Sequence, residues 1–177
     1  MTTPPTFPYF DDPIAAGSFK ASQAPCACCN NTSGWIYAHM IYSERDNDSR
    51  VCPGCIADGS AAAMCGGRFN TLARKVDDEE ASDQVRKRTP SFATWQGLEW
   101  PVCCEKPCVF RGYAQYEELT TRWPAAGEAL KATYQKGWLG TETADEFLQW
   151  FKSECDPAAY AFQCATCDRF HVPWDIS

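Results

Sequence analysis

Eight of the twelve cysteines in this 177-residue chain stand in four close pairs, and no other feature constrains its fold as strongly. Three pairs have two residues between their members, and the fourth pair has three. The pairs are Cys26 and Cys29, Cys52 and Cys55, Cys104 and Cys108, and Cys164 and Cys167. Two cysteines at this spacing reach one ion from a tight turn, and a second pair completes the tetrahedral sulfur coordination that zinc prefers. The sequence therefore predicts two zinc ions.

The four pairs can be coupled in three ways, and we expect coupling in sequence order. The first two pairs are separated by 22 residues, a loop typical of a ribbon-type site. The last two are separated by 55 residues, and the entropic cost of closing a loop grows only slowly with its length. Iron–sulfur ligation is the alternative to zinc, because thiolates bind such clusters too.

The remaining four cysteines have less definite roles. Cys28 lies between two expected ligands and Cys103 lies beside one, so either could replace its neighbour as a ligand. Cys65 and Cys155 fall at the ends of expected helices, where we expect them to be core or surface thiols.

The start of the chain lacks the basic residues, the apolar run and the cleavage site of a secretory signal, and no stretch reaches the length of a membrane span. A cytoplasmic protein is therefore expected. Thiols stay reduced in the cytosol, which favours metal ligation over disulfides. The 24 aromatic side chains can supply a core without disulfide bonds.

Helical, extended and loop segments are mixed along the chain, which predicts an α+β fold. We expect two zinc-ribbon- or knuckle-like β modules with short helices, fused into one compact domain. Residues 1–67 would form an N-terminal lobe with the first zinc site, and 68–88 a polar connection. Residues 89–177 would form a C-terminal lobe with the second site and two helices.

The clearest helices are expected at about 125–136 and 144–154. In the second helix, Phe147, Trp150 and Phe151 have the i, i+3, i+4 spacing of a core-facing stripe. Thr89 and Pro90 predict the start of a further short helix, because proline is favoured in the first helical turn.

Sites with four thiolates argue against zinc catalysis, since catalytic zinc usually keeps one coordination position open for water. The only histidines are His39 and His171, and the chain has no phosphate-binding glycine loop, nucleophile elbow or metalloprotease motif. We therefore expect no enzymatic activity and assign no catalytic or organic-cofactor residues. A stress or metal-handling enzyme of unknown chemistry remains a third hypothesis.

The formal charge of the chain is −7. Two zinc ions, each held by four thiolates, would bring it to about −11. An acidic surface repels the phosphate backbone that supplies most nucleic-acid affinity, so a basic protein partner is favoured over nucleic acid. The alternative is that the acidity only serves solubility.

A set of motifs spans nearly the whole chain in order. These motifs are Pro5-Thr-Phe-Pro-Tyr9, Asp12-Pro13, Gly17-Ser-Phe19, Cys26-Ala-Cys-Cys29, Cys52-Pro-Gly-Cys-Ile-Ala-Asp-Gly-Ser-Ala-Ala62, Arg88-Thr-Pro90, Trp95-Gln96, Cys104-Glu-Lys-Pro-Cys108, Gly112-Tyr113 and Cys164-Ala-Thr-Cys167. Together they resemble the CbrC family of bacterial proteins, which is associated with colicin tolerance. The resemblance implies a zinc-binding cytosolic protein, and some members resemble immunity factors encoded beside toxins.

The leading functional hypothesis is a zinc-stabilised binding protein, an immunity-type inhibitor that neutralises a bacterial toxin with a basic surface, such as a nuclease. Acidic residues in 77–83 and 142–146 are the expected contact face. The alternative is a zinc-ribbon protein in regulation or nucleic-acid handling. The short Arg86-Lys-Arg88 run lies near four acidic residues and gives that alternative little support.

Overall fold

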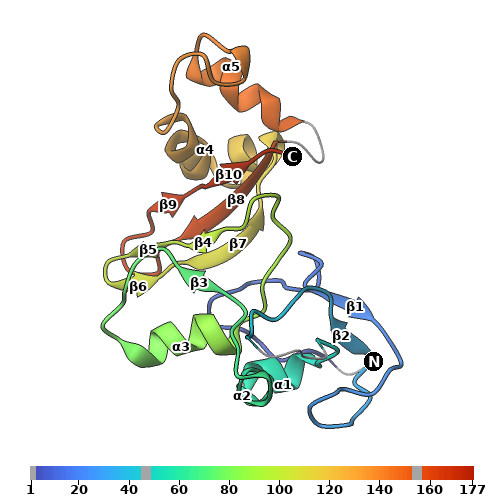
Figure 1. Ribbon diagram of the computed structural model, residues 1–177. Coiled ribbons are helices and arrows are strands. Elements are labelled where there is room, and N and C mark those ends of the chain that lie inside the picture. The colour runs from blue at the N-terminus through green and yellow to red at the C-terminus, as the bar shows by residue number, and fades with distance from the viewer. Residues whose placement is uncertain (1–2, 45–48, 153–156) are drawn as a thin grey trace. The chain divides into compact units, whose positions relative to one another are not determined.

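The computed structural model describes residues 3–44, 49–152 and 157–177, and the chain divides into two compact units. Unit 1 comprises Met1–Ala93 and Glu99–Pro107, and unit 2 comprises Thr94–Leu98 and Cys108–Ser177. The predicted α+β class is confirmed, with short helices and small sheets (Figure 1). Within the described ranges, no helix has the length and apolar character needed to cross a bilayer.

Unit 1 begins with aromatic residues that pack in its core. Phe7 and Phe10 are buried. The Phe7 ring stacks on Phe19 at 6.1 Å between centroids, and Phe10 contacts Phe92 and Trp100 at 6.0 and 6.4 Å. This arm therefore belongs to the folded unit.

Two short helices follow the first hairpin of unit 1. The strands of that hairpin, β1 (Phe19–Ala21) and β2 (Trp35–Tyr37), pair antiparallel. Helix α1 (Pro53–Ala57) has proline in its first turn, where the missing N–H costs nothing. Helix α2 (Ser60–Cys65) ends at Gly66, whose φ of 60° gives the left-handed cap that glycine adopts without strain.

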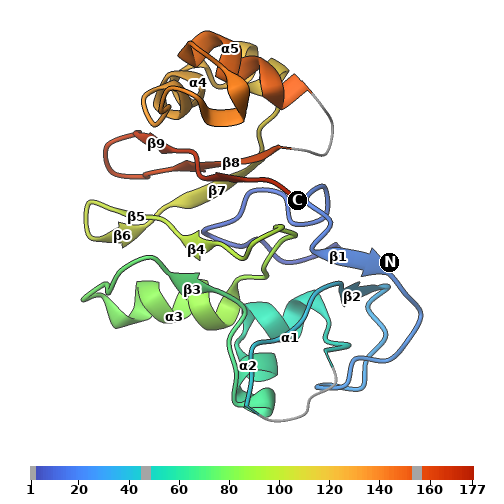
Figure 2. The ribbon, with the colours of Figure 1, turned by 45° about the horizontal axis from the view of Figure 1, so that its top comes forward.

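The polar segment 68–88, expected to be a connection between lobes, contains regular structure of unit 1. Strand β3 (Thr71–Leu72) pairs in parallel with β4 (Glu99–Trp100), and α3 (Glu79–Arg88) lies beside β3 (Figures 1 and 2). A further hairpin consists of β5 (Val102–Cys103) and β6 (Lys106–Pro107).

Helix α3 forms because both of its ends are satisfied. The Asp78 carboxylate accepts a hydrogen bond from the Ala81 N–H at 3.0 Å, as an N-cap does. At the other end, the buried Asn70 amide donates to the carbonyls of Val85 (3.0 Å) and Thr89 (2.8 Å). Acidic residues occupy the first turn and basic residues the last, which suits the helix dipole.

The prediction of a helix that starts at Thr89 is wrong. Thr89 instead terminates α3 with an extended backbone (φ −124°, ψ 129°), the conformation that a following proline favours. Residues 89–98 contain no helix.

Unit 2 is an antiparallel sheet covered by helices. Its strands are β7 (Val109–Tyr113), β8 (Ala158–Gln163), β9 (Phe170–His171) and β10 (Trp174–Asp175), and β8 pairs with the other three. The helical segments are η1 (Glu118–Arg122), α4 (Pro124–Lys131), η2 (Trp138–Gly140), α5 (Ala144–Gln149) and η3 (Trp150–Lys152). Helices α4 and α5 lie over one face of the sheet (Figure 2).

The two helices predicted in this region are present but shorter than expected, and the end of the second, residues 153–156, lies outside the described residues. Phe147 and Phe151 are buried in the core of unit 2, whereas Trp150 is 48% exposed. Helix α5 ends before Trp150, and the following turn is a 3-10 helix, so the α-helical spacing no longer applies at that residue.

Substitution of Gly127 tests the packing of α4 on η1. A Cβ at this position would collide with the carbonyl oxygen of Leu119 in η1. Alanine normally stabilises a helix interior relative to glycine, by about 0.5–1 kcal/mol. Here we expect Gly127→Ala to lower the free energy of unfolding by about 1–3 kcal/mol, the usual cost of overpacking.

The measurement is urea denaturation of the full chain. Gly54→Ala in α1 is the matched control, because its Cβ would meet only the Cys52 sulfur, at an ordinary 3.9 Å. A Gly127→Ala protein at least as stable as the wild type would contradict the close approach of α4 and η1.

Candidate metal centres

The first centre is a group of four cysteine sulfurs in unit 1, all within 4.8 Å of one another. They belong to Cys26, Cys29, Cys52 and Cys55, the residues predicted for the first site. The Cys26 and Cys55 sulfurs are 3.8 Å apart, and those of Cys29 and Cys52 are 3.9 Å apart. Zinc–sulfur bonds of about 2.3 Å give a tetrahedron whose edge is about 3.8 Å. The donor set and its spacing therefore fit one zinc ion.

Local backbone geometry positions these ligands. Cys52 is the N-cap of α1 and Cys55 lies in its first turn, so the start of the helix presents one pair. The other pair lies on a tight turn that is closed by a hydrogen bond from the Asn30 N–H to the Cys26 carbonyl (2.8 Å). Asn30 has a φ of 59°, a left-handed conformation that asparagine tolerates.

Backbone donors also stabilise a thiolate at this centre. Burial opposes ionisation of Cys26, but N–H groups of Cys29, Cys52 and Cys28 interact with its sulfur and lower its pKa to about 7. Burial raises the pKa of both Cys52 and Cys55. Four thiols this close can all ionise only around a cation, so the site calls for a metal ion.

The turn that carries Cys164 and Cys167 in unit 2 repeats the geometry of the Cys26 turn. The Asp168 N–H donates to the Cys164 carbonyl at 3.0 Å, as Asn30 does to Cys26 at 2.8 Å. The Asp168 φ of 58° matches the 59° of Asn30. In each turn the N–H two residues after the first cysteine approaches its sulfur at 3.4 Å. The two turns thus have equivalent knuckle geometry, which could present their cysteine sulfurs to a metal ion.

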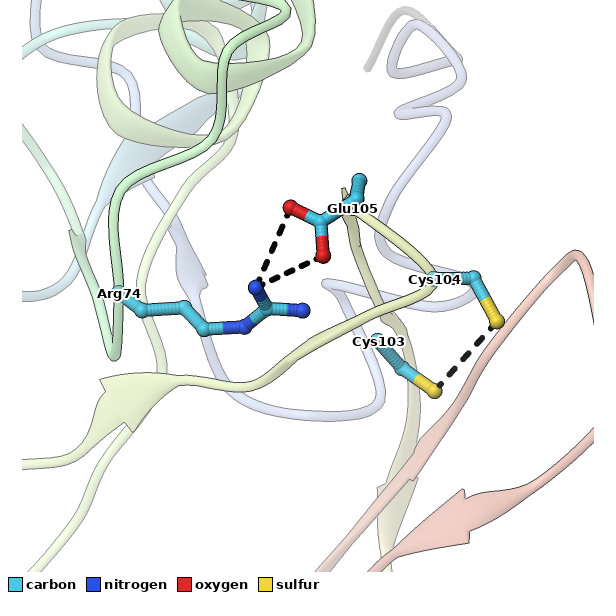
Figure 3. Close-up of polar contacts among 4 residues, drawn as sticks. All are labelled: Arg74, Cys103, Cys104 and Glu105. Carbon is cyan, nitrogen blue, oxygen red and sulfur yellow. Dashed lines mark hydrogen bonds and ion pairs between the residues drawn. The ribbon is translucent and has the colours of Figure 1, made fainter.

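A third cysteine pair lies at the tip of the β5–β6 hairpin. Cys104 and Glu105 have φ values of 49° and 58°, as in a two-residue type I′ turn. The sulfurs of Cys103 and Cys104 point toward one another, 3.9 Å apart (Figure 3). Glu105 extends instead toward Arg74, whose Nη1 donates to both carboxylate oxygens at 2.9 and 3.2 Å.

The second group of four cysteines consists of Cys103 and Cys104 of unit 1 and Cys164 and Cys167 of unit 2. Three of these were predicted ligands, and Cys103 stands where Cys108 was expected. Cys103 ends β5 and Cys104 begins the left-handed turn, with their sulfurs 3.9 Å apart, whereas Cys108 is fully buried just before β7. Among the described residues, two four-cysteine groups could therefore each hold a metal ion.

The other described cysteines lie outside both groups. The Cys28 sulfur is 3.5 Å from the Ser60 hydroxyl, Cys65 is buried, and Cys155 lies outside the described residues. Within the described part of the chain, no histidine or carboxylate joins either group. Asn30 and Asp168 are residues that sequence reasoning missed. Their signal was an Asn or Asp directly after the second cysteine of a two-residue-spaced pair.

Comparison with known proteins identifies the family. A family model described as an uncharacterised protein family, UPF0167, matches residues 4–176. The chain belongs to the UPF0167 family. The expected assignment to the CbrC family is therefore wrong, because both the matching family and its curated relatives carry the UPF0167 name.

The UPF0167 relatives match nearly end to end. UPF0167 protein PA1536 of Pseudomonas aeruginosa is 34% identical over 177 residues, which covers 98% of this chain and 97% of the relative. UPF0167 proteins Mb2317 of Mycobacterium bovis and MT2352 of Mycobacterium tuberculosis are each 31% identical over 166 residues, 92% of this chain and 88% of theirs. No solved structure matches this UPF0167 chain significantly.

Substitution of one ligand tests the first centre of this UPF0167 protein. We expect Cys52→Ser to release about one metal ion per chain and to unfold unit 1, because metal binding supplies much of the folding free energy of such small sites. Native mass spectrometry counts the bound ions, and limited proteolysis reports on unit 1.

Cys28→Ser is the matched control, since this thiol lies in the same turn but outside the four-sulfur group. It should keep the full metal content. A Cys52→Ser protein with wild-type metal content and protease resistance would refute the assignment of this centre.

Proposed function

We propose that this chain is a zinc-binding protein whose two ions have a structural role, and that it acts by binding a partner. The first centre carries the proposal, because its sulfurs stand at the spacing of a single zinc tetrahedron. Four thiolates fill the coordination shell of the ion, whereas catalytic zinc usually keeps one position open.

The spacing also supports zinc over an iron–sulfur cluster. A cluster places several iron and sulfide atoms between its cysteine ligands, so their sulfurs stand farther apart than ligands of one ion do. The separations of 3.8 and 3.9 Å in the first centre fit one ion.

Metal content and its pH dependence test the structural zinc. We expect about two zinc ions per chain, retained at neutral pH and released on acidification. A bound cation holds the pKa of its thiolates below the usual value, so the metal-dependent stability is present at and above neutral pH. It is lost as the pH falls through the lowered pKa values.

Elemental analysis gives the stoichiometry, and a zinc-binding dye reports release as the pH is lowered. One ion or none at neutral pH, or release on raising the pH instead, would contradict the two structural centres. Iron with matching inorganic sulfide would contradict zinc.

The partner we propose is a basic protein in the cytoplasm, specifically a bacterial toxin that this chain inhibits as an immunity protein. The support is electrostatic: the formal charge is −7, and two metal centres would take it to about −11. Asp77, Glu79 and Glu80 form an exposed acidic run in unit 1. Opposite charges steer association and raise its rate.

Co-expression with a basic toxin encoded beside the gene, followed by pull-down and kinetic measurement, tests this partner. Neutralising Asp77 and Glu80 together, as Asp77→Asn and Glu80→Gln, should slow association about threefold or more at low salt. Glu44→Gln, which removes one exposed charge elsewhere in unit 1, is the control and should change the rate little. No complex with the toxin would refute the immunity role, and tight, salt-dependent DNA binding would favour the nucleic-acid alternative.

A further inference from the structure

Unit 1 contains a groove along α3 that is basic although the chain as a whole is acidic. Two adjoining hollows of about 640 and 650 Å³ share Arg68, Asp83, Arg86 and Lys87 in their walls. Six cations line them, against the three carboxylates of Asp58, Glu79 and Asp83. The cations are Arg68, Arg74, Lys75, Arg86, Lys87 and Arg88. Six of the sixteen Lys and Arg residues of a chain with charge −7 thus gather in one groove.

Three of these cations already have acidic neighbours. Arg74 pairs with Glu105 (Figure 3), Lys87 pairs with Asp83 at 2.7 Å, and Lys75 lies 4.0 Å from Asp77. These pairs are at least partly exposed, so each contributes little by itself.

The other three are the arginines available to a ligand. Among the described residues, the guanidinium groups of Arg86 and Arg88 have no hydrogen-bond or ion-pair partner. In the described part of the chain, the one contact of the Arg68 guanidinium is its 3.4 Å hydrogen bond to the Thr71 hydroxyl. The helix dipole explains basic residues in the last turn of α3, but it does not explain Arg68, which comes from the loop before β3.

Gly59 makes room for the Arg88 side chain in the groove. Gly59 lines the second hollow with a φ of 84°, and a Cβ at this residue would lie 3.2 Å from the Arg88 Nε. The missing side chain at Gly59 therefore leaves the space beside the Arg88 guanidinium clear.

The side chains that line the α3 groove indicate which class of ligand it can bind. Arginine binds phosphate through two parallel N–H donors, and hollows of this volume suit small ligands. No aromatic side chain is among the described residues that line the two hollows, so there is no platform for stacking the bases of a single strand. A long polyanion would also extend beyond the groove and meet the acidic surface within a Debye length of about 8–10 Å.

We propose that the α3 groove of unit 1 binds a small ligand with several phosphate groups, held by Arg68, Arg86 and Arg88. The site does not depend on the proposed toxin partner or on the role of the metal ions. The shared chemistry of its ligand is an oligophosphate chain, either free or attached to a nucleoside.

Isothermal titration calorimetry on the zinc-loaded full chain tests the groove, with inorganic triphosphate and a nucleoside triphosphate as separate probes. Combined Arg86→Gln and Arg88→Gln should weaken triphosphate binding by at least about tenfold, since each charge-assisted contact is lost. Arg68→Gln, which lies off the helix, should weaken it in the same direction. Lys20→Gln removes the same charge from β1, outside the groove, and should leave the affinity within about twofold.

Thermal melts identify any variant that binds triphosphate weakly only because it is unfolded. If the Arg86→Gln and Arg88→Gln protein is unfolded, the triphosphate affinity of Arg68→Gln decides the result. Tighter binding of the nucleoside triphosphate than of inorganic triphosphate would show that the ligand is an oligophosphate attached to a nucleoside. Equal binding of the two would show that it is a free oligophosphate. Absence of millimolar triphosphate binding, or equal affinity of wild type and arginine variants, would overturn the proposal. Tighter binding of an oligonucleotide of about 12 nucleotides, lost in the arginine variants, would also overturn it, in favour of a nucleic-acid site.

Discussion

Four thiols held 3.8–3.9 Å from their nearest neighbours cannot all ionise unless a cation lies among them, and the first half of unit 1 is arranged around this condition. The knuckle at Cys26 and the start of α1 at Cys52 come from separate segments, which also meet through a hydrogen bond from the Ala27 N–H to the Arg50 carbonyl (2.8 Å). One tetrahedral ion would join both segments, and the short elements β1, β2 and α1 could then be stable at lengths too small to persist alone.

The sequence indicated most of the cysteines that the structure gathers into groups, because the spacing of cysteines reports directly on turn geometry. Seven of the eight predicted ligands lie in the two four-sulfur groups. The exception concerns a local choice between Cys103 and Cys108. Their positions depend on a two-residue hairpin turn with left-handed backbone at Cys104 and Glu105. Neither cysteine nor glutamate is a residue type that predicts a left-handed conformation.

Helix α3 shows why secondary structure in the polar segment was harder to predict. Its capping signals were present, with Asp78 before an acidic first turn and basic residues in the last turn. Only Ala81 and Val85 bury side chains, so the hydrophobic periodicity that usually reveals a helix was too weak to register. The decisive contribution comes from Asn70, whose amide satisfies carbonyls at the far end of the helix, and no local pattern predicts such a contact.

The two four-cysteine groups differ in how far solvent reaches their sulfurs. In the first group only Cys29 is exposed, whereas in the second both Cys104 and Cys167 are exposed. Electrophiles and competing chelators attack a coordinated thiolate through its accessible face, so an ion held by the second group would be the more labile of the two. Under oxidative or metal-poor conditions the protein would therefore pass through a half-loaded form, with the N-terminal centre still occupied.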